Sequence, residues 1–255
     1  MSKSSFCPKA IKTARDVSVF EINNNSVMVI GCDSAGGIGP KPLDKVKVSG
    51  FTLGRFTARV ALMEVLAVGA TPVCLTNTLG VEPDPTGSEI VEGINNEVKL
   101  AQLDDSLVVI GSMEKTVPVE QTGIGVTVVG LAHKNKLKIG LSHPDNLIIA
   151  IGCPSVKNEV LPAEKRGEIV DLKDLLRLIN SDFVNEVIPV GSQGILHEVN
   201  VLSQDSGLSA KLDLPEIDFK KSAGPATAVL AAIEKNHLNQ LSSLINKPMR
   251  VIGSF

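Results

Sequence analysis

Short runs rich in Val and Ile alternate along the chain with longer segments of helical period. The runs predict strands at residues 17–22, 27–32, 72–79, 107–111 and 126–132, and again at 147–151, 186–190, 210–214 and 249–252. The periodic segments predict helices near residues 57–68, 87–103, 172–178, 193–204 and 226–234. This alternation indicates a mixed α/β protein.

The polar, basic stretch 133–138 separates two such mixtures of strands and helices. It follows an apolar strand and precedes a new one, as a domain boundary does. We therefore expect two domains, residues 1–138 and 139–255.

Composition narrows the class of protein. With 43% hydrophobic and 21% charged residues among 255, the chain is long enough to bury a substantial core. The net charge is -3, no Lys/Arg block is present, and Trp and Tyr are absent, which argues against a nucleic-acid partner.

No secretory signal is visible and no apolar run reaches the ~20 residues that span a bilayer, so we expect a soluble, cytoplasmic protein with no membrane partner. The cysteines have no zinc-site spacing, which favours reduced thiols.

A carboxylate stands at the end of the predicted strand 27–32. Asp33 is followed by a glycine-rich loop, where a phosphate can approach the backbone closely. Gly37 and Ile38 occupy the places where a Walker A loop requires Lys and Ser or Thr, and the dinucleotide-binding glycine pattern also fails at Pro40. The alternative for Asp33 is an ordinary turn-capping aspartate.

Glu64 is the one charged residue within the apolar stretch 60–70. A helix that is apolar nearly all round is buried, and a buried carboxylate needs a compensating cation or donor. Mg²⁺ would serve, because it takes one or two carboxylates together with substrate phosphates. The alternatives place Glu64 on a narrow solvent-facing stripe, or in an ion pair with Arg55 or Arg59 on the same helix.

Two weaker candidates follow. Glu114 comes three residues after the Gly that ends the predicted strand 107–111, and with Asp33 and Glu64 it would complete a set of three acids around phosphate-bound metal. The alternative for Glu114 is a loop acid beside Lys115.

At residues 222–228 a small, flexible turn precedes Pro225, which predicts a helix start whose free N–H groups could hold an anion. The alternative is an ordinary helix start.

Together these segments resemble the superfamily of aminoimidazole ribonucleotide synthetase, thiamine-monophosphate kinase, selenophosphate synthetase and the hydrogenase maturation ATPase. The resemblance depends on residues 32–36 after a strand, on Glu64 five residues before Gly69, and on residues 110–111 before Glu114. Residues 190–195, 206–210 and 222–224 extend it into the second half. It implies that the acids bind magnesium and the phosphates of ATP.

Several departures point to a narrower branch. Glu64 and Gln193 stand where those enzymes usually have Asp, and residues 112–114 replace a Gly-Gly-acid pattern. Residues 32–39, 56–64, 121–127 and 222–227 are similar to the α-ribazole kinases of cobamide (cobalamin) salvage. That branch implies transfer of the ATP γ-phosphate to the 5′-hydroxyl of the riboside of 5,6-dimethylbenzimidazole.

The resemblance also implies an architecture and a set of site residues. The N-terminal domain would bind ATP and Mg²⁺ and form a homodimer through a shared β-barrel, and the C-terminal domain would be an α/β sandwich. Asp44 would be a possible base or water-bridged partner, with a solvated surface acid as the alternative. The implied residues are Asp33, Glu64 and Lys41 for catalysis; Asp33, Gly36, Gly37, Lys41, Arg59, Glu64, Glu114, Gln121 and Thr122 for the nucleotide; Asp33, Glu64 and Glu114 for the metal; and Ser222, Gly224 and Thr227 for the small-molecule substrate.

Other functions stay open at this level. One is another enzyme of the superfamily, either similar to thiamine-monophosphate kinase or a synthetase that forms a phosphorylated intermediate. The other is a non-catalytic nucleotide-binding module.

Overall fold

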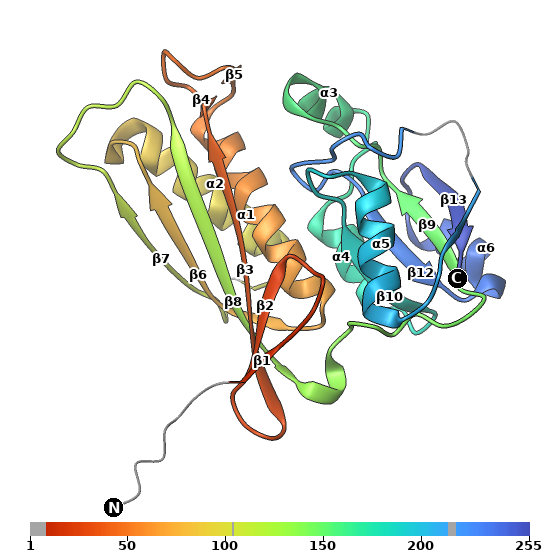
Figure 1. The fold of residues 1–255 in the computed structure, drawn as a ribbon. Coiled ribbons are helices and arrows are strands. Elements are labelled where there is room, and N and C mark those ends of the chain that lie inside the picture. Colours follow the sequence, from red (N-terminus) through yellow and green to blue (C-terminus); the bar gives the residue numbers. More distant parts are fainter. Residues whose placement is uncertain (1–8, 104, 214–217) are drawn as a thin grey trace, which may run out of the picture.

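The structure is a computed structural model that describes residues 9–103, 105–213 and 218–255. Its first half is a six-stranded sheet in the order β1-β2-β3-β8-β6-β7 (Figure 1). All neighbours are antiparallel except the parallel pair β6 and β7. The strands are β1 (Lys9–Ile11), β2 (Val17–Glu21), β3 (Ser26–Gly36), β6 (Thr71–Leu79), β7 (Val108–Met113) and β8 (Gly123–His133).

Two helices cover one face of this sheet: α1 (Gly50–Ala67) and α2 (Ser88–Leu100). The Ser49 side chain caps α1 by accepting the Thr52 N–H. Along β3, buried residues alternate with more exposed ones, and Val27, Val29 and Gly31 face the helices. A small parallel pair, β4 (Ile38–Gly39) and β5 (Val46–Lys47), extends the glycine-rich loop beyond β3, and the turn Pro83–Gly87 leads into α2.

The second half is a five-stranded antiparallel sheet in the order β10-β12-β9-β13-β11. Its strands are β9 (Leu147–Ile151), β10 (Val184–Pro189), β11 (Lys211–Leu212), β12 (Val229–Ile233) and β13 (Met249–Ser254). The helices of this half are α3 (Val160–Lys165), α4 (Leu172–Ile179), α5 (Ile195–Ser206) and α6 (Leu238–Leu244), with short 3₁₀ turns at Lys134–Lys136, Lys157–Glu159 and Lys235–His237.

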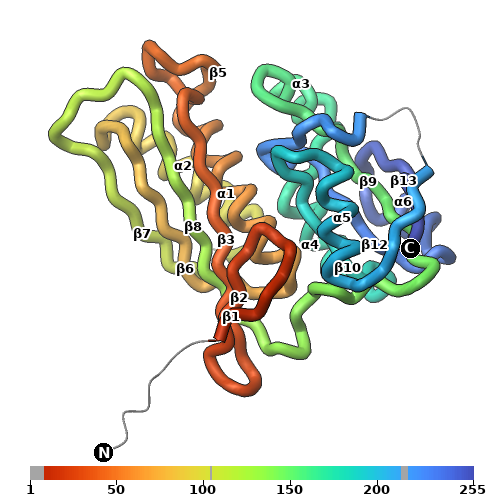
Figure 2. The backbone as a smooth tube through the Cα atoms, in the orientation of Figure 1, coloured from red at the N-terminus to blue at the C-terminus, as the bar shows by residue number. Residues whose placement is uncertain are grey.

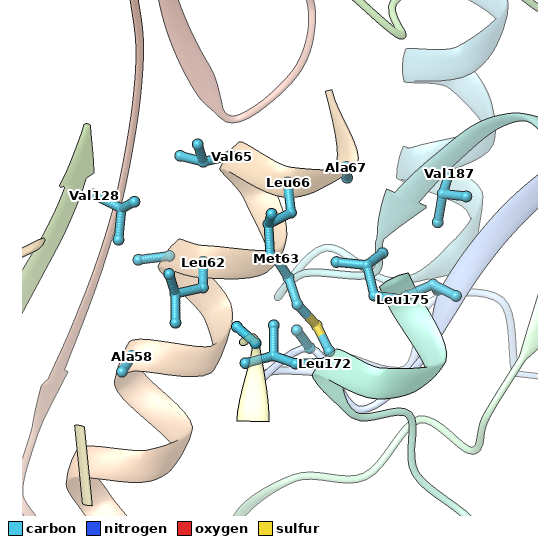
Figure 3. Packing of buried hydrophobic residues seen from close by; sticks show 14 of the residues in the cluster. Ala58, Leu62, Met63, Val65, Leu66, Ala67, Val128, Leu172, Leu175 and Val187 are labelled. Atoms are coloured by element: carbon cyan, nitrogen blue, oxygen red, sulfur yellow. The ribbon is translucent and has the colours of Figure 1, made fainter. Parts of the chain in front are cut away.

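Helix α1 lies between the two halves (Figure 2). Figure 3 shows Met63 extending toward Leu172 and Leu175 of α4, while Val65 lies on the side of Val128 in β8. One hydrophobic core therefore joins the first sheet, α1, α4 and one face of the second sheet, and a separate cluster packs α5 against the other face. The backbone positions of α1 are held from both sides.

The helix expected at residues 226–234 is wrong, because residues 229–233 form β12. Every residue of this strand is buried, and it pairs with β10 on one side and β9 on the other. A central strand covered on both faces is a continuous apolar run without alternation, so its Ala-rich sequence resembles a buried helix. The predicted strand 210–214 is shorter than expected at Lys211–Leu212, and residue 214 lies outside the described residues.

The mixed α/β fold is confirmed. The division at residue 138 stays a prediction, although the strands of the first sheet end at His133 and those of the second begin at Leu147. In the described part of the chain, no helix is both long and apolar enough to cross a membrane.

Candidate functional site

Asp33 is in the last part of β3, paired with Val126 of β8, and lines a cavity of about 370 Å³ between the two halves of the chain. Burial raises the pKa of Asp33 to about 6, and the Ser34 N–H opposes this rise only in part. A carboxyl group with such a pKa can accept a proton near neutral pH. The cavity wall beside Asp33 continues into Gly36, at the start of the glycine-rich loop.

Glu64 is buried on α1 with 8% of its surface exposed, directly beneath β3. The close approach depends on Gly31, because a Cβ there would lie 3.3 Å from Glu64 Cβ. Burial raises the pKa of Glu64 well above its usual value, and the charges of Asp16, Glu198 and Asp33 add to the rise against the opposing charge of Arg15. Within the described residues the carboxylate makes no hydrogen bond or ion pair. Neither alternative, a solvent-facing stripe or a pair with Arg55 or Arg59, describes this glutamate.

Two further acids near Glu64 were missed by the sequence reasoning: exposed Asp16, ahead of β2, and buried Glu198 on α5. Glu198 accepts the Gly191 N–H at 3.3 Å, but burial still raises its pKa to about 7. The sequence contains a signal for Glu198. This residue lies at helical spacing between Ile195 and Leu202, which are both buried, so it is an acid on the apolar face of a helix.

Arg15, whose charge opposes the pKa rise of Glu64 and Glu198, already forms ion pairs with other acids. Its Nη2 is 2.8 Å from Glu186 Oε1 and its Nε is 3.4 Å from Asp205 Oδ2, in the second half of the chain. Asp33, Glu64 and Glu198 therefore keep a negative charge, when ionised, that no side-chain ion pair in the described residues offsets.

The glycine-rich loop gathers four of the predicted nucleotide residues. The Gly37 N–H donates to Thr122 O at 2.9 Å, and a Cβ on Gly37, whose φ is +70°, would lie 2.9 Å from Gln121 Nε2. Lys41 forms an ion pair with Glu82 at the edge of this loop. Partial burial opposes the charge of Glu82, but Lys41 and the Thr86 hydroxyl hold its pKa at about 2.

Asp44 fastens this loop, so the alternative of a solvated surface acid is wrong. It is buried, and its carboxylate accepts hydrogen bonds from Thr122 N at 2.8 Å, Thr122 Oγ1 at 2.6 Å and Lys41 N at 2.8 Å. Three donors bind its two oxygens, so Asp44 holds this loop in place.

Arg59 is not part of this constellation. It is buried against α2, where its Nε and Nη2 lie 3.1 and 2.8 Å from the carboxylate oxygens of Glu97. Arg55 joins the same carboxylate at 3.2 Å and reaches Glu164 of α3 at 2.6 Å. Both arginines of α1 are thus held in a network that connects the two halves.

Glu114 also lies apart from Asp33 within one chain. It follows β7, three strands away from β3 in the sheet, which alone corresponds to about 14 Å. Its Oε1 accepts hydrogen bonds from Thr116 Oγ1 and Thr116 N, each at 2.7 Å, and from Val117 N at 3.0 Å. These bonds hold the pKa of Glu114 at about 2 and account for the side chain as a loop cap.

The residues of the 222–227 turn divide between two roles. Gly224 and Pro225 line the cavity opposite Asp33. Thr227 is fully buried and holds the turn together, accepting the Ser155 N–H at 2.9 Å and lying 3.0 Å from Ala223 O, while Ser222 Oγ accepts the Gly224 N–H at 3.3 Å. Because no helix begins here, the expected helix N-terminus for an anion is absent from this described turn.

The donor set at Asp33 and Glu64 fits Mg²⁺ better than a softer metal. In the described residues no three His, Cys, Asp or Glu side chains gather closely enough to form a metal cage. Mg²⁺ needs no cage, because it is held by one or two carboxylates together with phosphate oxygens and water. Asp33 and Glu64, which form no ion pair in the part of the chain that the structure describes, match that requirement.

The segment that contains Asp33 and Glu64 matches a known family. Residues 14–132 match the family "AIR synthase related protein, N-terminal domain". The matched segment contains β3, α1, the glycine-rich loop, Asp33 and Glu64. Comparison with curated proteins finds no match.

Solved structures share the fold over nearly the whole chain. Thiamine-monophosphate kinase from Stenotrophomonas maltophilia K279a is 17% identical with a TM-score of 0.62, over 96% of this chain and 88% of that one. The HypE–HypF complex contains a chain that is 15% identical with a TM-score of 0.64, over 98% and 90% of the two chains. T. maritima PurL, solved with ADP, is 15% identical with a TM-score of 0.65, and matches 97% of this chain with 42% of its own length. At these identities the likeness establishes the shared fold.

Proposed function

We propose that the protein is an ATP- and Mg²⁺-dependent kinase of the cytoplasm that phosphorylates an alcohol group on a small molecule. The observation that carries the proposal is the pair Asp33 and Glu64, two carboxylates that form no ion pair within the described residues. Asp33 lines the cavity beside the glycine-rich loop, and Glu64 is buried against Gly31 of the same strand. Thiamine-monophosphate kinase and PurL structures solved with ATP, ADP or AMPPCP support the use of ATP.

Each part of the site has a role in this reaction. The backbone N–H groups around Gly36 and Gly37, with Lys41 and Gln121, would hold the phosphates of ATP. Asp33 and Glu64 would hold Mg²⁺, which when bound neutralises charge on the transferring phosphoryl group. Since phosphoryl transfer requires positioning and charge neutralisation, this small set of groups suffices.

The transfer balances without a further reactant. The acceptor oxygen forms a bond to the γ-phosphorus, and the bond from that phosphorus to the β,γ-bridging oxygen breaks, leaving its electron pair on ADP. The acceptor hydroxyl loses its proton to water, because the carboxylate of Asp33 would be bound to Mg²⁺.

For the acceptor we propose α-ribazole, the riboside of 5,6-dimethylbenzimidazole used in cobamide salvage. Its support is the sequence similarity to that branch at residues 32–39, 56–64 and 121–127. Ser222, Gly224 and Thr227 would shape the acceptor side, with Gly224 in contact and the other two fixing the turn.

A homodimer through the first sheet is part of the proposal. The face of this sheet away from α1 and α2 exposes Val108 by 58%, Ile110 by 56% and Leu131 by 42%. An apolar sheet face of this kind is typical of a protein–protein contact. A shared barrel would cover it.

The proposal is tested by measuring ADP formation with Mg²⁺, ATP and α-ribazole. We expect turnover that Asp33→Ala and Glu64→Ala each abolish, with far-ultraviolet circular dichroism unchanged. Full activity in either variant would refute the metal assignment. Preference for thiamine monophosphate over α-ribazole would refute the acceptor and leave an ATP-dependent kinase in place.

A further inference from the structure

The cavity beside Asp33 is built by both halves of the chain. From the first half it is lined by β3, the β4–β5 segment and the first turns of α1, and from the second half by the start of α3 and the 224–225 turn. In Figure 1, β4, β5 and α3 lie at the same end of the molecule. The apolar side chains that line the cavity include Ile38, Val46, Phe56, Val160 and Leu161.

The lining is mostly apolar and its formal charge balances. Asp33 and Lys157 are its charged side chains, one on each half of the chain. Away from Asp33 and Gly36, which the proposed function assigns to Mg²⁺ and phosphate, most of the lining side chains are aliphatic or aromatic. The chemistry therefore favours an uncharged molecule with a largely apolar body.

The position of the cavity beside Asp33 indicates that it holds the acceptor and not the adenine of ATP. Whatever fills the cavity touches Asp33, which the proposed function places at the transferring phosphoryl group. An acceptor hydroxyl must lie within about 3–3.5 Å of the reacting phosphorus. Adenine is separated from the γ-phosphate by a ribose and two more phosphates, so it lies elsewhere.

The Phe56 side chain, which lines the cavity from α1, is held in place by its neighbours. The guanidinium carbon of Arg59 lies 4.5 Å from the centroid of the Phe56 ring, and that of Arg55 lies 5.4 Å from it. Phe56 also packs with Val160 of α3 in a small core that joins the two halves. Leu161, by contrast, is 39% exposed and lines the cavity from the other side.

We propose that this cavity is the acceptor site, that it takes an alcohol carried on an uncharged, largely apolar ring system, and that Phe56 and Leu161 select the acceptor. This inference rests on the proposed kinase function. It adds the location of the acceptor and the residues of α1 and α3 that determine specificity.

Binding can be measured without turnover. The chain contains no Trp and no Tyr, so the fluorescence of a benzimidazole riboside can be followed with little protein background. We would titrate wild-type protein into α-ribazole at pH 7.5 without nucleotide and record fluorescence anisotropy. Thiamine monophosphate, which is charged, would be tested by calorimetry under the same conditions.

The decisive variant is Leu161→Arg, which puts a long charged side chain on the apolar wall at a partly exposed position. Leu141→Arg is the matched control, since Leu141 is similarly exposed at 42% and does not line the cavity. We expect Leu161→Arg to weaken α-ribazole binding at least tenfold and Leu141→Arg to leave it unchanged. Both variants should unfold at the wild-type urea midpoint and bind Mg²⁺·ATP normally.

Three results would overturn the inference: wild-type affinity for α-ribazole in Leu161→Arg, a parallel loss of Mg²⁺·ATP binding in that variant, or wild-type protein that does not bind α-ribazole. If α-ribazole binds in the expected way but no ADP forms, the acceptor site stands as a binding site and the proposed kinase function fails.

Discussion

Two buried glutamates, Glu97 on α2 and Glu64 on α1, differ in how their charge is balanced. Glu97 is fully buried, with oxygens 2.8–3.2 Å from the nitrogens of Arg59 and Arg55. Glu64 is 8% exposed and, in the described residues, has no partner. Burial is thus common to both glutamates, and they differ in whether an ion pair within the described residues balances the negative charge.

Helix α1 presents these two environments on different sides. Arg59 and Glu64 are five residues apart on α1, which turns them about 140° from each other around the axis. The arginines face α2, and Glu64 faces β3 at Gly31. The ion pairs with Glu97 therefore cannot serve Glu64.

The largest expected effect on stability is at Glu97, whose charge is balanced by the two arginines. Glu97→Gln removes the fully buried carboxylate that pairs with Arg59 and leaves it only the longer contact to Glu164 at 3.5 Å. We expect this to lower the free energy of unfolding by about 3–5 kcal/mol. Urea unfolding at pH 7 would measure this. Glu92→Gln, at an exposed position on the same helix, is the control and should change little. A loss below about 1 kcal/mol would mean that the network contributes no more than a surface pair.

The next effect concerns the acids without partner cations. Burial raises the pKa of Glu198 from 4.5 to about 7, so between these pH values the folded protein retains a proton that the unfolded chain releases. Its contribution to stability is therefore complete below about pH 4.5 and falls by about 3 kcal/mol as the pH rises to 7. Glu198→Gln should remove that part of the slope in urea unfolding measured at several pH values without Mg²⁺. An unchanged slope in the variant would contradict the unbalanced environment of Glu198.

The smallest effect is expected at the exposed edge of the loop. The Glu82 carboxylate is 33% exposed and paired with Lys41, and such pairs contribute about 0.2–1 kcal/mol. Because the pKa of Glu82 is lowered to about 2, this contribution is present above about pH 4.5 and is lost as the pH falls through 2. Glu82→Gln should therefore cost less than about 1 kcal/mol at pH 7, and progressively less as the pH falls through 2, as measured by thermal unfolding. A larger loss would place this pair with the buried network.

Local patterns predicted the fold well where one face of an element is exposed. The amphipathic period of α2 and the apolar run of β3 were visible in the sequence, and so was the burial of Glu64 among apolar neighbours. The strand β12 was misread as a helix because burial on both faces removes the alternation that marks a strand.

The partners of charged residues could not be predicted in the same way. The pairing of Arg59 with Glu97 depends on how α1 packs on α2, and the approach of Glu198 to Glu64 depends on contacts between residues over 130 positions apart. Such long-range placement leaves no spacing in the sequence. Asp16 and Glu198 were therefore not among the predicted site residues, and the ion pair between Arg59 and Glu97 was not predicted either.

The central claim is that Glu64 holds a divalent cation, and cation binding tests it most directly. We would titrate Mn²⁺, as a substitute for Mg²⁺, into protein saturated with a non-hydrolysable ATP analogue and follow binding by calorimetry. Glu64→Gln should weaken Mn²⁺ binding at least 100-fold, about 2.7 kcal/mol, while its urea unfolding shows no loss of stability. Wild-type affinity for Mn²⁺ in a folded Glu64→Gln protein would contradict the account.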